Sequence, residues 1–505
     1  MNTLLVDSIS AVTCDQARVF EARLLGKNEW AEWNAMEQAG RGVAEMLLLD
    51  FEELGGFPAT GRILAVVGKG HNGGDALITT RLLLQQFPRA QAEICFVFGE
   101  QSLRPLAKRA WRDLITAASS RVVLRRCDDA LGTYDLCLDG LFGFQYRPPL
   151  DPAVARFLGH VNRSSVRLRA AIDLPSGWDA PDAFRADFTY ATGLLKRPLF
   201  SLPNAGRLRL VDLGWTLDES EVEGAPRVLL PRLLEPLSRL RASAADKRTF
   251  GHVGIVGGSR NYPGAVLMAV KAALRSGVGL VTAFVPESLT PAFAAAAPEA
   301  MWVGWPETPS GSLSLEGAYL LREKMGRVTA WVVGPGLGRE PETLICVKEL
   351  LGTTTAPVVI DAEALQADLV HHGSVPRILT PHAGEWARIS KRESIESFAA
   401  ETNAVVVAKG PLTAVVSGWQ RYYSLAGGPV LARGGSGDVL AGLVGGLLAQ
   451  DPENPLSAAA RGVLWHGLTA DHLARAQGQT AVVVTDLIPL LASTLRATST
   501  QVRST

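Results

Sequence analysis

Hydrophobic residues recur along this chain in two alternating patterns. Short runs rich in β-branched residues, such as RILAVV from Arg62 and HVGIV from His252, predict strands, because such residues favour extended backbone and buried sheet positions. Each run is followed by a glycine-rich turn and then by apolar residues at helical spacing. Strands that alternate with helices predict mostly parallel sheets with helices on both faces. The expected fold class is therefore α/β, with doubly wound sheets.

The first half of the chain repeats this scheme several times. Residues 14–54 carry apolar positions at helical spacing and predict one or two amphipathic helices. Further strands are predicted at 92–99, 133–143 and 168–179, with a helix at 105–117. Ligands of doubly wound sheets bind beyond the carboxyl ends of the strands, so polar residues there are candidates for a site. These residues are Asn72, Asp75, Asp139, Asp173 and Ser176.

A change of composition divides the chain. Between about residues 217 and 243 it turns acidic and then rich in proline, leucine and arginine, which indicates a domain boundary. We expect a first domain at 1–220, a linker at 221–242 and a second domain at 243–505. A second α/β series opens between His252 and Pro286 with strand, glycine-rich turn, helix and strand. It continues with strands predicted within 331–338, 356–365, 377–386 and 404–416.

The last motif of this series, ARGGSGDVLAGLVGGLLAQ, joins a glycine-dense loop to a long apolar helix. Gly434, Gly435 and Gly437 leave room for backbone N–H groups to turn toward an anion, and the positive end of the helix points at the same place. Asp438 stands at the mouth of this phosphate cradle, where a carboxylate could take a proton from a hydroxyl group. The alternative is that Asp438 only caps the helix N-terminus.

Bulk composition restricts the possible partners. The 505 residues include 50 basic and 50 acidic side chains, so no net charge recruits nucleic acid or an anionic membrane. No run approaches the roughly 20 apolar residues of a membrane span, and the Gly442 to Gly446 spacing predicts close packing of a soluble helix. The five cysteines contain no CxxC pair and suit buried structural thiols in a reducing compartment. We expect a cytoplasmic protein.

Two further groups of residues could carry chemistry. In GKGHNGGD, Asn72 and Asp75 could hold a ribose, a phosphate or a hard cation, although an Asx-capped turn is the simpler alternative. Asp139 and Asp173 end different strands of one sheet and could converge on one pocket as a general acid or base, or each could cap its own turn. In the second half, Lys409 with Thr413 indicates a nucleotide contact, with a solvated surface lysine as the alternative.

A cluster of strand-end residues in the second half invites a metal interpretation. Asp361, His382, Glu385 and Asp438 follow different predicted strands or open the last helix. Their spacing contains neither HxxxH nor CxxC, which argues against a tight zinc site.

Taken together, these motifs resemble a known family over nearly the whole chain. GKGHNGGD, LDGLFG and IDLPSGWD in the first half, with VVGPGLG, PVVIDAEAL, LTPHAGEW, AKGPLT and GGSGDVLAGL in the second, are similar to the bifunctional NAD(P)H-hydrate repair enzymes. The resemblance implies a Rossmann-like N-terminal epimerase domain and a ribokinase-like C-terminal dehydratase domain. The substrate would be NADH or NADPH to which water has added across the C5–C6 double bond.

For the first domain the resemblance implies interconversion of the R and S hydrates at C6. Asn72, Asp139 and Ser176 would bind a potassium ion, and Asp173 would contact the reacting end as a catalytic residue. The sequence departs from the family where His71 replaces an asparagine and Ala76 a glycine. The implied hydrate-binding set of this domain is His71, Asn72, Gly73, Gly74, Asp75, Gly143 and Asp173.

For the second domain the resemblance implies dehydration of the S hydrate at the expense of ADP or ATP with Mg²⁺, and Asp438 is the implied catalytic residue. Glu363 and Ser436 replace the residues that the family usually has. The hydrate would contact Ala265, Gly336, His382 and Asp438. The nucleotide would contact Lys409, Gly410, Pro411, Leu412, Thr413 and Gly437. The family also tends to form homo-oligomers.

Two other classes of function stay open at this point. A ribokinase-like kinase of a vitamin precursor would carry the same GGSGD loop, although TPHAGEW and the additional first domain argue against it. A non-catalytic nucleotide-binding or scaffolding role is conceivable for the first domain because of His71.

Overall fold

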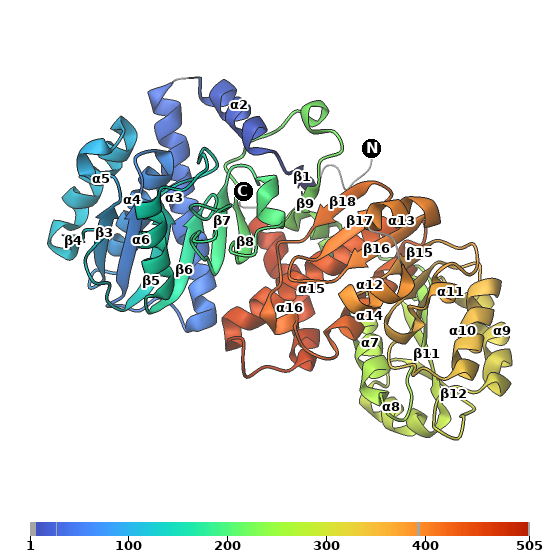
Figure 1. The fold of residues 1–505 in the computed structure, drawn as a ribbon. Helices are drawn as coiled ribbons and strands as arrows, with labels where there is room; N and C mark the ends of the chain where they lie inside the picture. Colours follow the sequence, from blue (N-terminus) through green and yellow to red (C-terminus); the bar gives the residue numbers. More distant parts are fainter. Residues whose placement is uncertain (1–6, 27, 391–393, 503–505) are drawn as a thin grey trace. The chain divides into compact units, whose positions relative to one another are not determined.

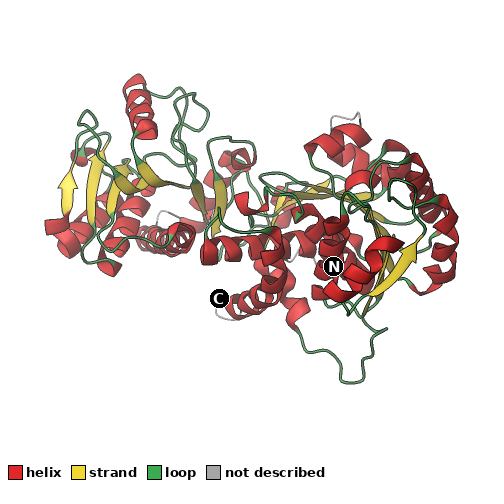
Figure 2. Ribbon diagram, turned by 90° about the horizontal axis from the view of Figure 1, so that it is seen from below, coloured by secondary structure: helices red, strands yellow, loops and turns green. Residues whose placement is uncertain are grey.

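The computed structural model describes residues 7–26, 28–390 and 394–502, and it folds them into two compact units (Figure 1). The first unit comprises Ser10–Ala225, and the second comprises the chain from Pro226 onward together with the N-terminal stretch that ends at Ile9. Each unit is a sheet with helices packed on its faces, which confirms the α/β class (Figure 2). No helix in the described part of the chain is both long and apolar enough to cross a membrane.

The first unit is built on a seven-stranded sheet of the order β4-β3-β2-β5-β6-β7-β8, in which all neighbours pair in parallel. Its strands are β2 (Arg62–Val67), β3 (Gln91–Phe96), β4 (Val122–Leu124), β5 (Tyr134–Gly140), β6 (Val166–Ile172), β7 (Phe188–Thr192) and β8 (Arg207–Val211). The α-helices are α2 (Cys14–Leu25), α3 (Glu29–Phe51), α4 (His71–Gln86), α5 (Pro105–Ala118) and α6 (Pro152–Arg163). Short 3₁₀ turns are η1 (Glu52–Leu54), η2 (Glu100–Ser102), η3 (Ser119–Arg121), η4 (Arg197–Phe200) and η5 (Glu219–Val222).

Strand β2 explains why helices cover both faces of this sheet. Successive side chains of a strand point to opposite faces, and here both sets are apolar and buried. Ile63, Ala65 and Val67 pack into the core formed with α3, α4 and α5. Leu64 and Val66 pack on the other face, in the core to which α6 contributes. A strand without a polar face therefore lies at the centre of a three-layer unit.

The second unit contains an eleven-stranded sheet of the order β1-β9-β18-β17-β16-β15-β14-β13-β10-β11-β12. Six consecutive pairings, from β16 through β12, are parallel, whereas β16-β17 and β17-β18 are antiparallel. Its strands are β1 (Ser8–Ser10), β9 (Arg227–Leu229), β10 (His252–Val256), β11 (Leu280–Pro286), β12 (Met301–Trp305), β13 (Ala330–Val333), β14 (Val358–Ile360), β15 (Arg377–Leu379), β16 (Ala404–Ala408), β17 (Ala414–Ser417) and β18 (Gln420–Tyr423).

Helices cover both faces of this sheet as well. The α-helices are α7 (Pro263–Arg275), α8 (Thr290–Ala296), α9 (Tyr319–Lys324), α10 (Pro341–Thr353), α11 (Ala367–Val370), α12 (Ala383–Ile389), α13 (Ile395–Thr402), α14 (Ser436–Gln450), α15 (Pro455–Gln477) and α16 (Leu487–Val502). The 3₁₀ turns are η6 (Pro231–Ser238), η7 (Glu287–Leu289), η8 (Leu315–Ala318), η9 (Met325–Arg327), η10 (Ala362–Ala364), η11 (Pro429–Leu431) and η12 (Val484–Asp486).

Helix α14 is the apolar helix predicted after the glycine-dense loop, and it lies in the core against α7. A Cβ atom on Gly442 would lie 2.0 Å from the carbonyl oxygen of Ala269, and one on Gly446 would lie 2.1 Å from the Ser276 hydroxyl oxygen. Glycine is therefore required at both positions for the two helices to approach. The prediction that this spacing allows close helix packing is confirmed.

The segment expected to be a linker, 221–242, differs from an unstructured connection. It contains β9, which pairs with β18, and η6, whose Leu233 and Leu234 are fully buried. The amino-terminal segment also differs from the expectation, since β1 joins the sheet of the second unit beside β9. Composition suggested a linker because prolines and arginines dominate locally, whereas the leucines between them are used in the core of the second unit.

The segment 404–416, expected as part of the parallel series, contains two strands. Strand β16 continues the parallel sheet, and β17 turns back antiparallel to it, so that the loop from Lys409 to Thr413 connects a hairpin. Periodicity could not separate the two strands because AVVVA and AVV are equally apolar.

Candidate functional site

In each unit the predicted site residues gather where the strand order reverses. In the first sheet the chain runs from β2 outward through β3 to β4 and then returns to place β5 on the other side of β2. The loops that follow β2 and β5 therefore run in opposite directions from the carboxyl ends of these strands. They leave a crevice between them, which is where such sheets bind ligands. The GKGHNGGD turn follows β2, and the LFG segment follows β5.

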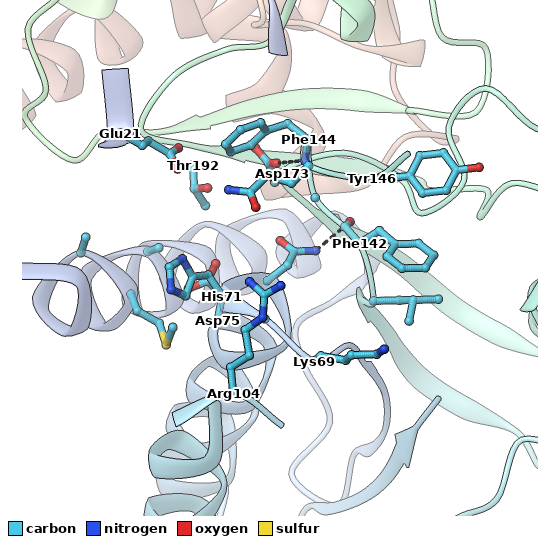
Figure 3. A pocket seen from close by; sticks show the side chains of 18 of the residues that line it. Glu21, Lys69, His71, Asp75, Arg104, Phe142, Phe144, Tyr146, Asp173 and Thr192 are labelled. Atoms are coloured by element: carbon cyan, nitrogen blue, oxygen red, sulfur yellow. Dashed lines mark hydrogen bonds between the residues drawn. The ribbon is translucent and has the colours of Figure 1, made fainter. Parts of the chain in front are cut away.

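A cavity of about 540 Å³ lies at this crevice of the first unit (Figure 3). It is lined by the predicted residues His71, Asn72, Asp75, Gly143 and Asp173. Gly73 and Gly74 are buried in the first turn of α4, and Asp139 and Ser176 are fully buried, so these four residues lie outside the cavity lining.

Asp173 and Lys196 form a buried ion pair at one end of this cavity. The Lys196 ammonium contacts Asp173 Oδ1 and donates to the Thr192 carbonyl over 3.1 Å, and it is fully buried. The other carboxylate oxygen, Oδ2, accepts the Phe144 backbone N–H over 2.7 Å. Asp173 has a φ of 67°, in the left-handed region that few non-glycine residues adopt. The backbone and the lysine together fix this carboxylate in the cavity wall.

Gly143 allows that wall to close. A Cβ atom at Gly143 would lie 2.7 Å from Asp173 Oδ2 and 3.5 Å from Asn72 Oδ1, so any larger residue would displace the carboxylate. The alternative that Asp173 caps its own turn is not what the structure contains, because the amide it binds belongs to a distant loop.

Asn72, Asp139 and Ser176 come together around the backbone of Phe142, behind the cavity wall. Asp139 Oδ1 lies 2.6 Å from the Ser176 hydroxyl oxygen, and Ser176 N–H donates to Asp139 Oδ2 over 2.7 Å. The Asn72 amide donates to the Phe142 carbonyl over 2.9 Å. Asp139 also accepts the Leu141 N–H over 3.2 Å, so it caps its own turn as well as binding Ser176. In the described residues this buried carboxylate has no lysine or arginine partner, and burial raises its pKa to about 6.

The far end of the cavity is basic. Lys69 and Arg104 line it, and neither forms an ion pair within the described residues; the Lys69 ammonium lies 4.4 Å from the Phe98 ring centre. His71 lies 3.5 Å from a Glu32 carboxylate oxygen, and desolvation lowers the pKa of its imidazole. Helix α4 begins here with Gly70 as its cap and no side-chain cap, so its first N–H groups stay available for an anion. The Asx-capped turn is therefore not formed.

Two acidic side chains in the cavity have no hydrogen bond or ion pair among the described residues. Burial strongly raises the pKa of Asp75, and the nearby charge of Asp173 raises it further. Burial raises the pKa of Glu21 to about 7, with Lys196 opposing the shift and Asp173 adding to it. Glu21 belongs to α2 and escaped sequence reasoning because an acid within an amphipathic helix is usually solvated.

Sequence reasoning also missed Lys196, Lys69 and Arg104 as site residues. Lys69 lies inside the GKGHNGGD turn, and Arg104 precedes α5 in the loop that follows β3. Their positions beyond strand ends were a usable signal, because strand ends face the crevice.

The second unit repeats the topological arrangement. The chain runs outward from β10 to β12 and returns to place β13 on the other side of β10. Gly336 follows β13 with a φ of 65°, and a Cβ atom there would lie 3.0 Å from the Ala265 side chain near the start of α7. The two predicted hydrate contacts therefore lie together at the switch point.

A charged cluster follows the neighbouring strands β14, β15 and β16. The Lys409 ammonium lies 3.1 Å from Asp361 Oδ1 and 3.6 Å from Glu385 Oε2. Thr380 donates to Asp361 over 2.6 Å, and the His382 backbone N–H donates to Glu385 over 2.8 Å. With 20% of its side chain exposed, Lys409 is not the solvated surface lysine that was the alternative.

Asp438 lies in the first turn of α14 and faces this cluster. The cap of α14 is Gly435 with a φ of 97°, and no side chain caps the helix, which excludes the capping role considered for Asp438. Burial raises the pKa of Asp438 to about 7; Asp361 adds to the shift and Lys409 opposes it. A Cβ atom on Gly437 would lie 3.2 Å from the Lys409 ammonium, so the helix start and the lysine are neighbours.

The predicted nucleotide contacts lie on the β16-β17 loop that Lys409 begins. Gly410 and Pro411 are exposed, whereas Leu412 and Thr413 are half-buried. The Thr413 carbonyl accepts the Ser424 N–H over 3.0 Å, which ties the loop to the segment after β18. In the described residues no group of three or more His, Cys, Asp or Glu side chains is arranged to hold a metal ion.

Comparisons with known proteins extend this picture. The family model described as NAD(P)H-hydrate dehydratase matches residues 253–492, and the one described as YjeF-related protein N-terminus matches residues 33–197. The bifunctional NAD(P)H-hydrate repair enzyme of Moorella thermoacetica is 35% identical, with 91% of this chain and 92% of that protein aligned. This chain belongs to the bifunctional NAD(P)H-hydrate repair enzymes. The repair enzyme of Gloeobacter violaceus is likewise 35% identical, over 87% of this chain and 89% of its own.

A solved structure of ADP/ATP-dependent NAD(P)H-hydrate dehydratase from Bacillus subtilis, co-crystallized with ATP/Mg²⁺, is 27% identical to this repair enzyme and covers 54% of it and 98% of its own chain, with a TM-score of 0.48. The expected family is confirmed by the relatives that align over most of the chain, and the alternative of a vitamin-precursor kinase is not supported. The dehydratase match lies within the second unit of the repair enzyme, and the N-terminal match lies within the first.

Proposed function

We propose that the second unit dehydrates the S form of hydrated NADH or NADPH at the expense of ADP or ATP, with Asp438 as the base. The observation that carries this proposal is the position of the Asp438 carboxyl group. It is half-buried beside Lys409 at the start of α14, and it does not cap the helix. Hydroxide is a poor leaving group near neutral pH, so the hydroxyl group must first be phosphorylated. A base with a pKa near the working pH suits that step.

In the proposed reaction Asp438 accepts the hydroxyl proton as the oxygen attacks the terminal phosphorus of the nucleotide. Lys409 and the free N–H groups at the start of α14 stabilise the negative charge of the phosphate oxygens. The phosphate then leaves with the electron pair of the C–O bond, and the neighbouring ring carbon loses a proton to restore the double bond. Ala265, Gly336 and His382 would contact the hydrate, and the loop 409–413 with Gly437 would contact the nucleotide.

A magnesium ion fits the charge balance of this cluster. Burial raises the pKa of Asp438, the charges of Asp361, Glu363 and Glu385 raise it further, and Lys409 opposes them. Asp361 and Glu385, the carboxylates beside Lys409, are the oxygen donors that could hold Mg²⁺ together with the nucleotide phosphates. When bound, the ion would neutralise charge on the transferring phosphate.

We propose that the first unit epimerises the hydrates at C6, with Asp173 as the base at the reacting end. The phosphates of the substrate would lie at the basic end, near Lys69, Arg104 and the start of α4, and the hydrated ring would lie beside Asp173. This orientation is supported by Lys69 and Arg104, which form no ion pair within the described residues, at one end of the cavity and by Asp173 at the other.

Potassium binding by Asn72, Asp139 and Ser176 fits the oxygens gathered there. Their carboxylate, hydroxyl and amide oxygens, with the Phe142 carbonyl, are hard donors. Asp139 is buried and lacks a cationic side-chain partner in the described residues, so a bound cation would balance its charge. Such an ion would orient the backbone of Phe142 next to the cavity.

The dehydratase proposal is tested with Asp438→Asn. We expect the dehydration rate to fall at least about 1000-fold, since general-base catalysis contributes about 10²–10⁴ and the nucleophile would also lose its orientation. ADP and ATP binding, measured by calorimetry, should stay within about threefold of the parent because Lys409 is retained. Recovery of dihydronicotinamide absorbance at the parent rate would contradict the assignment.

The epimerase proposal is tested with Asp173→Ala on a mixture of R and S hydrates. The variant should restore only the S fraction, with the R fraction left unchanged, because the dehydratase residues lie in the other unit. Loss of both activities would contradict independent sites. The same assay on the parent protein tests whether His71 permits epimerisation at all.

The family resemblance also bears on the oligomeric state of the protein and on its location in the cell. We propose a homo-oligomer in the cytoplasm; light scattering at micromolar concentration tests the first, and cell fractionation tests the second.

A further inference from the structure

The epimerase reaction needs a group that the proposed function does not supply. C6 of the hydrate carries a hydroxyl group and is bonded to ring N1, so its configuration can invert only if a bond to C6 breaks and forms again. Removal of the hydroxyl proton by Asp173 is half of that process. The other half is delivery of a proton to the atom that leaves C6, which calls for an acid in the same cavity.

Several other titratable side chains lie in or beside the cavity and could be that acid. Lys196 is fully buried and already binds Asp173 and the Thr192 carbonyl. His71 is at the opposite, basic end beside Glu32, and desolvation lowers its pKa. The pKa of Tyr146 is raised to about 12 by burial, and its hydroxyl group points away from Asp173 (Figure 3).

Among the cavity acids, Glu32 lies 3.5 Å from His71, and Asp151 accepts backbone N–H groups at the start of α6, so Glu21 and Asp75 remain. Both line the cavity, and both are within electrostatic reach of Asp173 and Lys196. Asp75 is buried near the start of α4, on the same helix as His71 (Figure 3), and burial together with the charge of Asp173 raises its pKa. Glu21 is half-buried on α2, and Figure 3 places its carboxyl group with Thr192 at the Asp173 end of the cavity.

The Glu21 carboxyl group is bound by none of the described residues. Both of its oxygens are without a hydrogen bond or ion pair among the described residues, and the two arginines of α2 bind other carboxylates, Arg18 that of Asp15 and Arg23 that of Glu221. The other acid of α2, Asp15, is 86% exposed and pairs with Arg18 on the helix surface. An acid directed into a cavity without a protein partner is available to a ligand.

We propose that Glu21 is the general acid of the epimerase, acting with Asp173 on the hydrated ring. The inference rests on the proposed epimerase function of the first unit. Asp173 takes the hydroxyl proton, the C6–O bond becomes a carbonyl, and the C6–N1 bond breaks with its electron pair on N1. Glu21 gives N1 a proton. After rotation about C5–C6, N1 attacks the other face of the aldehyde, its proton returns to Glu21, and Asp173 returns the proton to oxygen.

Helix α2, which carries Glu21, is held in place by contacts at its start and along its buried face. Thr13 and Gln16 form a complete capping box at its start, with N–H to side-chain distances of 2.9 and 3.1 Å. Phe20, the neighbour of Glu21, is buried and contacts Trp215 at 5.9 Å between ring centres. These contacts fix the helix and hold Glu21 at the cavity.

The test compares Glu21→Gln with Asp15→Asn, a matched control that removes one carboxylate from the exposed side of the same helix. The full chain is supplied with mixed R and S hydrates and with ADP or ATP, and the R-dependent phase is followed after the S fraction is consumed. For Glu21→Gln we expect kcat of epimerisation to fall about 100-fold with KM within about threefold. Asp15→Asn should match the parent protein. Glu21→Asp should retain more activity than the glutamine variant.

A pH profile separates catalysis from structure. In the parent protein kcat for epimerisation should fall above about pH 7, as the acid loses its proton, and this limb should be absent from the residual activity of Glu21→Gln. Parent-like epimerisation by Glu21→Gln, or a loss confined to KM, would overturn the inference. Loss of the R-dependent phase in Asp75→Asn, with Glu21→Gln unaffected, would assign the role to Asp75 instead. If the parent itself leaves the R fraction untouched while dehydrating S, the proposed epimerase function fails and the inference fails with it.

Discussion

Asp438 and Asp173 lie in opposite electrostatic surroundings, although both are proposed to accept a proton. Burial raises the pKa of Asp438 to about 7, and the neighbouring carboxylate of Asp361 adds to the shift while Lys409 opposes it. Asp173 instead contacts the buried Lys196 ammonium and accepts the Phe144 backbone N–H. The sequence identified both residues as candidates because each follows a strand or opens a helix beside glycines. Their different surroundings depend on residues far away in the chain.

The raised pKa of Asp438 predicts how dehydration depends on pH. The carboxylate form accepts the proton, so kcat/KM for the S hydrate should rise through about pH 7 and level off above it. The measurement is the initial rate at subsaturating hydrate and saturating nucleotide across that range. ADP binding measured over the same range is the control. A flat profile below pH 7 with unchanged nucleotide binding would contradict the role of Asp438.

The Asp173 and Lys196 pair predicts a stability effect. Asp173→Asn leaves the Lys196 ammonium buried without its carboxylate, which should lower the free energy of unfolding of the first unit by about 3–5 kcal/mol. The double variant Asp173→Asn with Lys196→Met should recover at least about half of that loss, because no charge remains buried. Urea unfolding measures both, and Asp15→Asn, in an exposed pair, should change stability by less than about 1 kcal/mol. An Asp173→Asn protein of parental stability would refute the buried-charge argument.

At the scale of the elements, helices and strands were largely predictable and their contacts were not. The predicted helix at 105–117 is α5 (Pro105–Ala118), and the apolar helix after the GGSGD loop is α14. Proline at the first helical position and a sustained apolar period are local signals. Which helix packs against α14 is not local, and only the structure identifies α7.

The contact between α14 and α7 predicts opposite signs for two similar substitutions. Gly442→Ala would place a Cβ atom 2.0 Å from the Ala269 carbonyl oxygen and should destabilise the second unit by about 1–3 kcal/mol. Gly264→Ala, in α7, meets nothing within 4 Å and should stabilise by up to about 1 kcal/mol through helix propensity. Thermal unfolding of both proteins measures the difference. Equal effects would mean that the helices can separate at no cost.

In the complete chain, the two units are not simply the first and second halves of the sequence. The N-terminal strand β1 belongs to the sheet of the second unit, where Arg227 on β9 donates to the Ser8 hydroxyl over 2.7 Å and to its carbonyl over 3.0 Å. A boundary placed by composition at about residue 220 assigns this strand to the wrong unit. Strands β1 and β9 are neighbours in this sheet although the whole first unit lies between them in the sequence, and local composition gives no sign of such a pairing.

Deletion of residues 1–9 should therefore weaken the second unit rather than the first. Scanning calorimetry with and without ADP identifies the transition of the second unit, because a ligand raises only the transition of the unit that binds it. That transition should fall by at least about 2 °C, the shift that about 1 kcal/mol produces in a domain of this size. A fall confined to the other transition would contradict the assignment of β1.

Local sequence patterns are enough to predict the α/β class, the positions of most strands and helices, and the motifs that carry the family resemblance. These properties depend on the period of apolar residues and on turn glycines, which are set by near neighbours in the chain. Three-dimensional packing places Glu21 in a cavity with Asp173, which binds Lys196. It also pairs Lys409 with Asp361 and Glu385 and adds β1 to the second sheet. Such contacts join residues far apart in sequence. They depend on strand order and on the direction of each side chain, which no local pattern encodes.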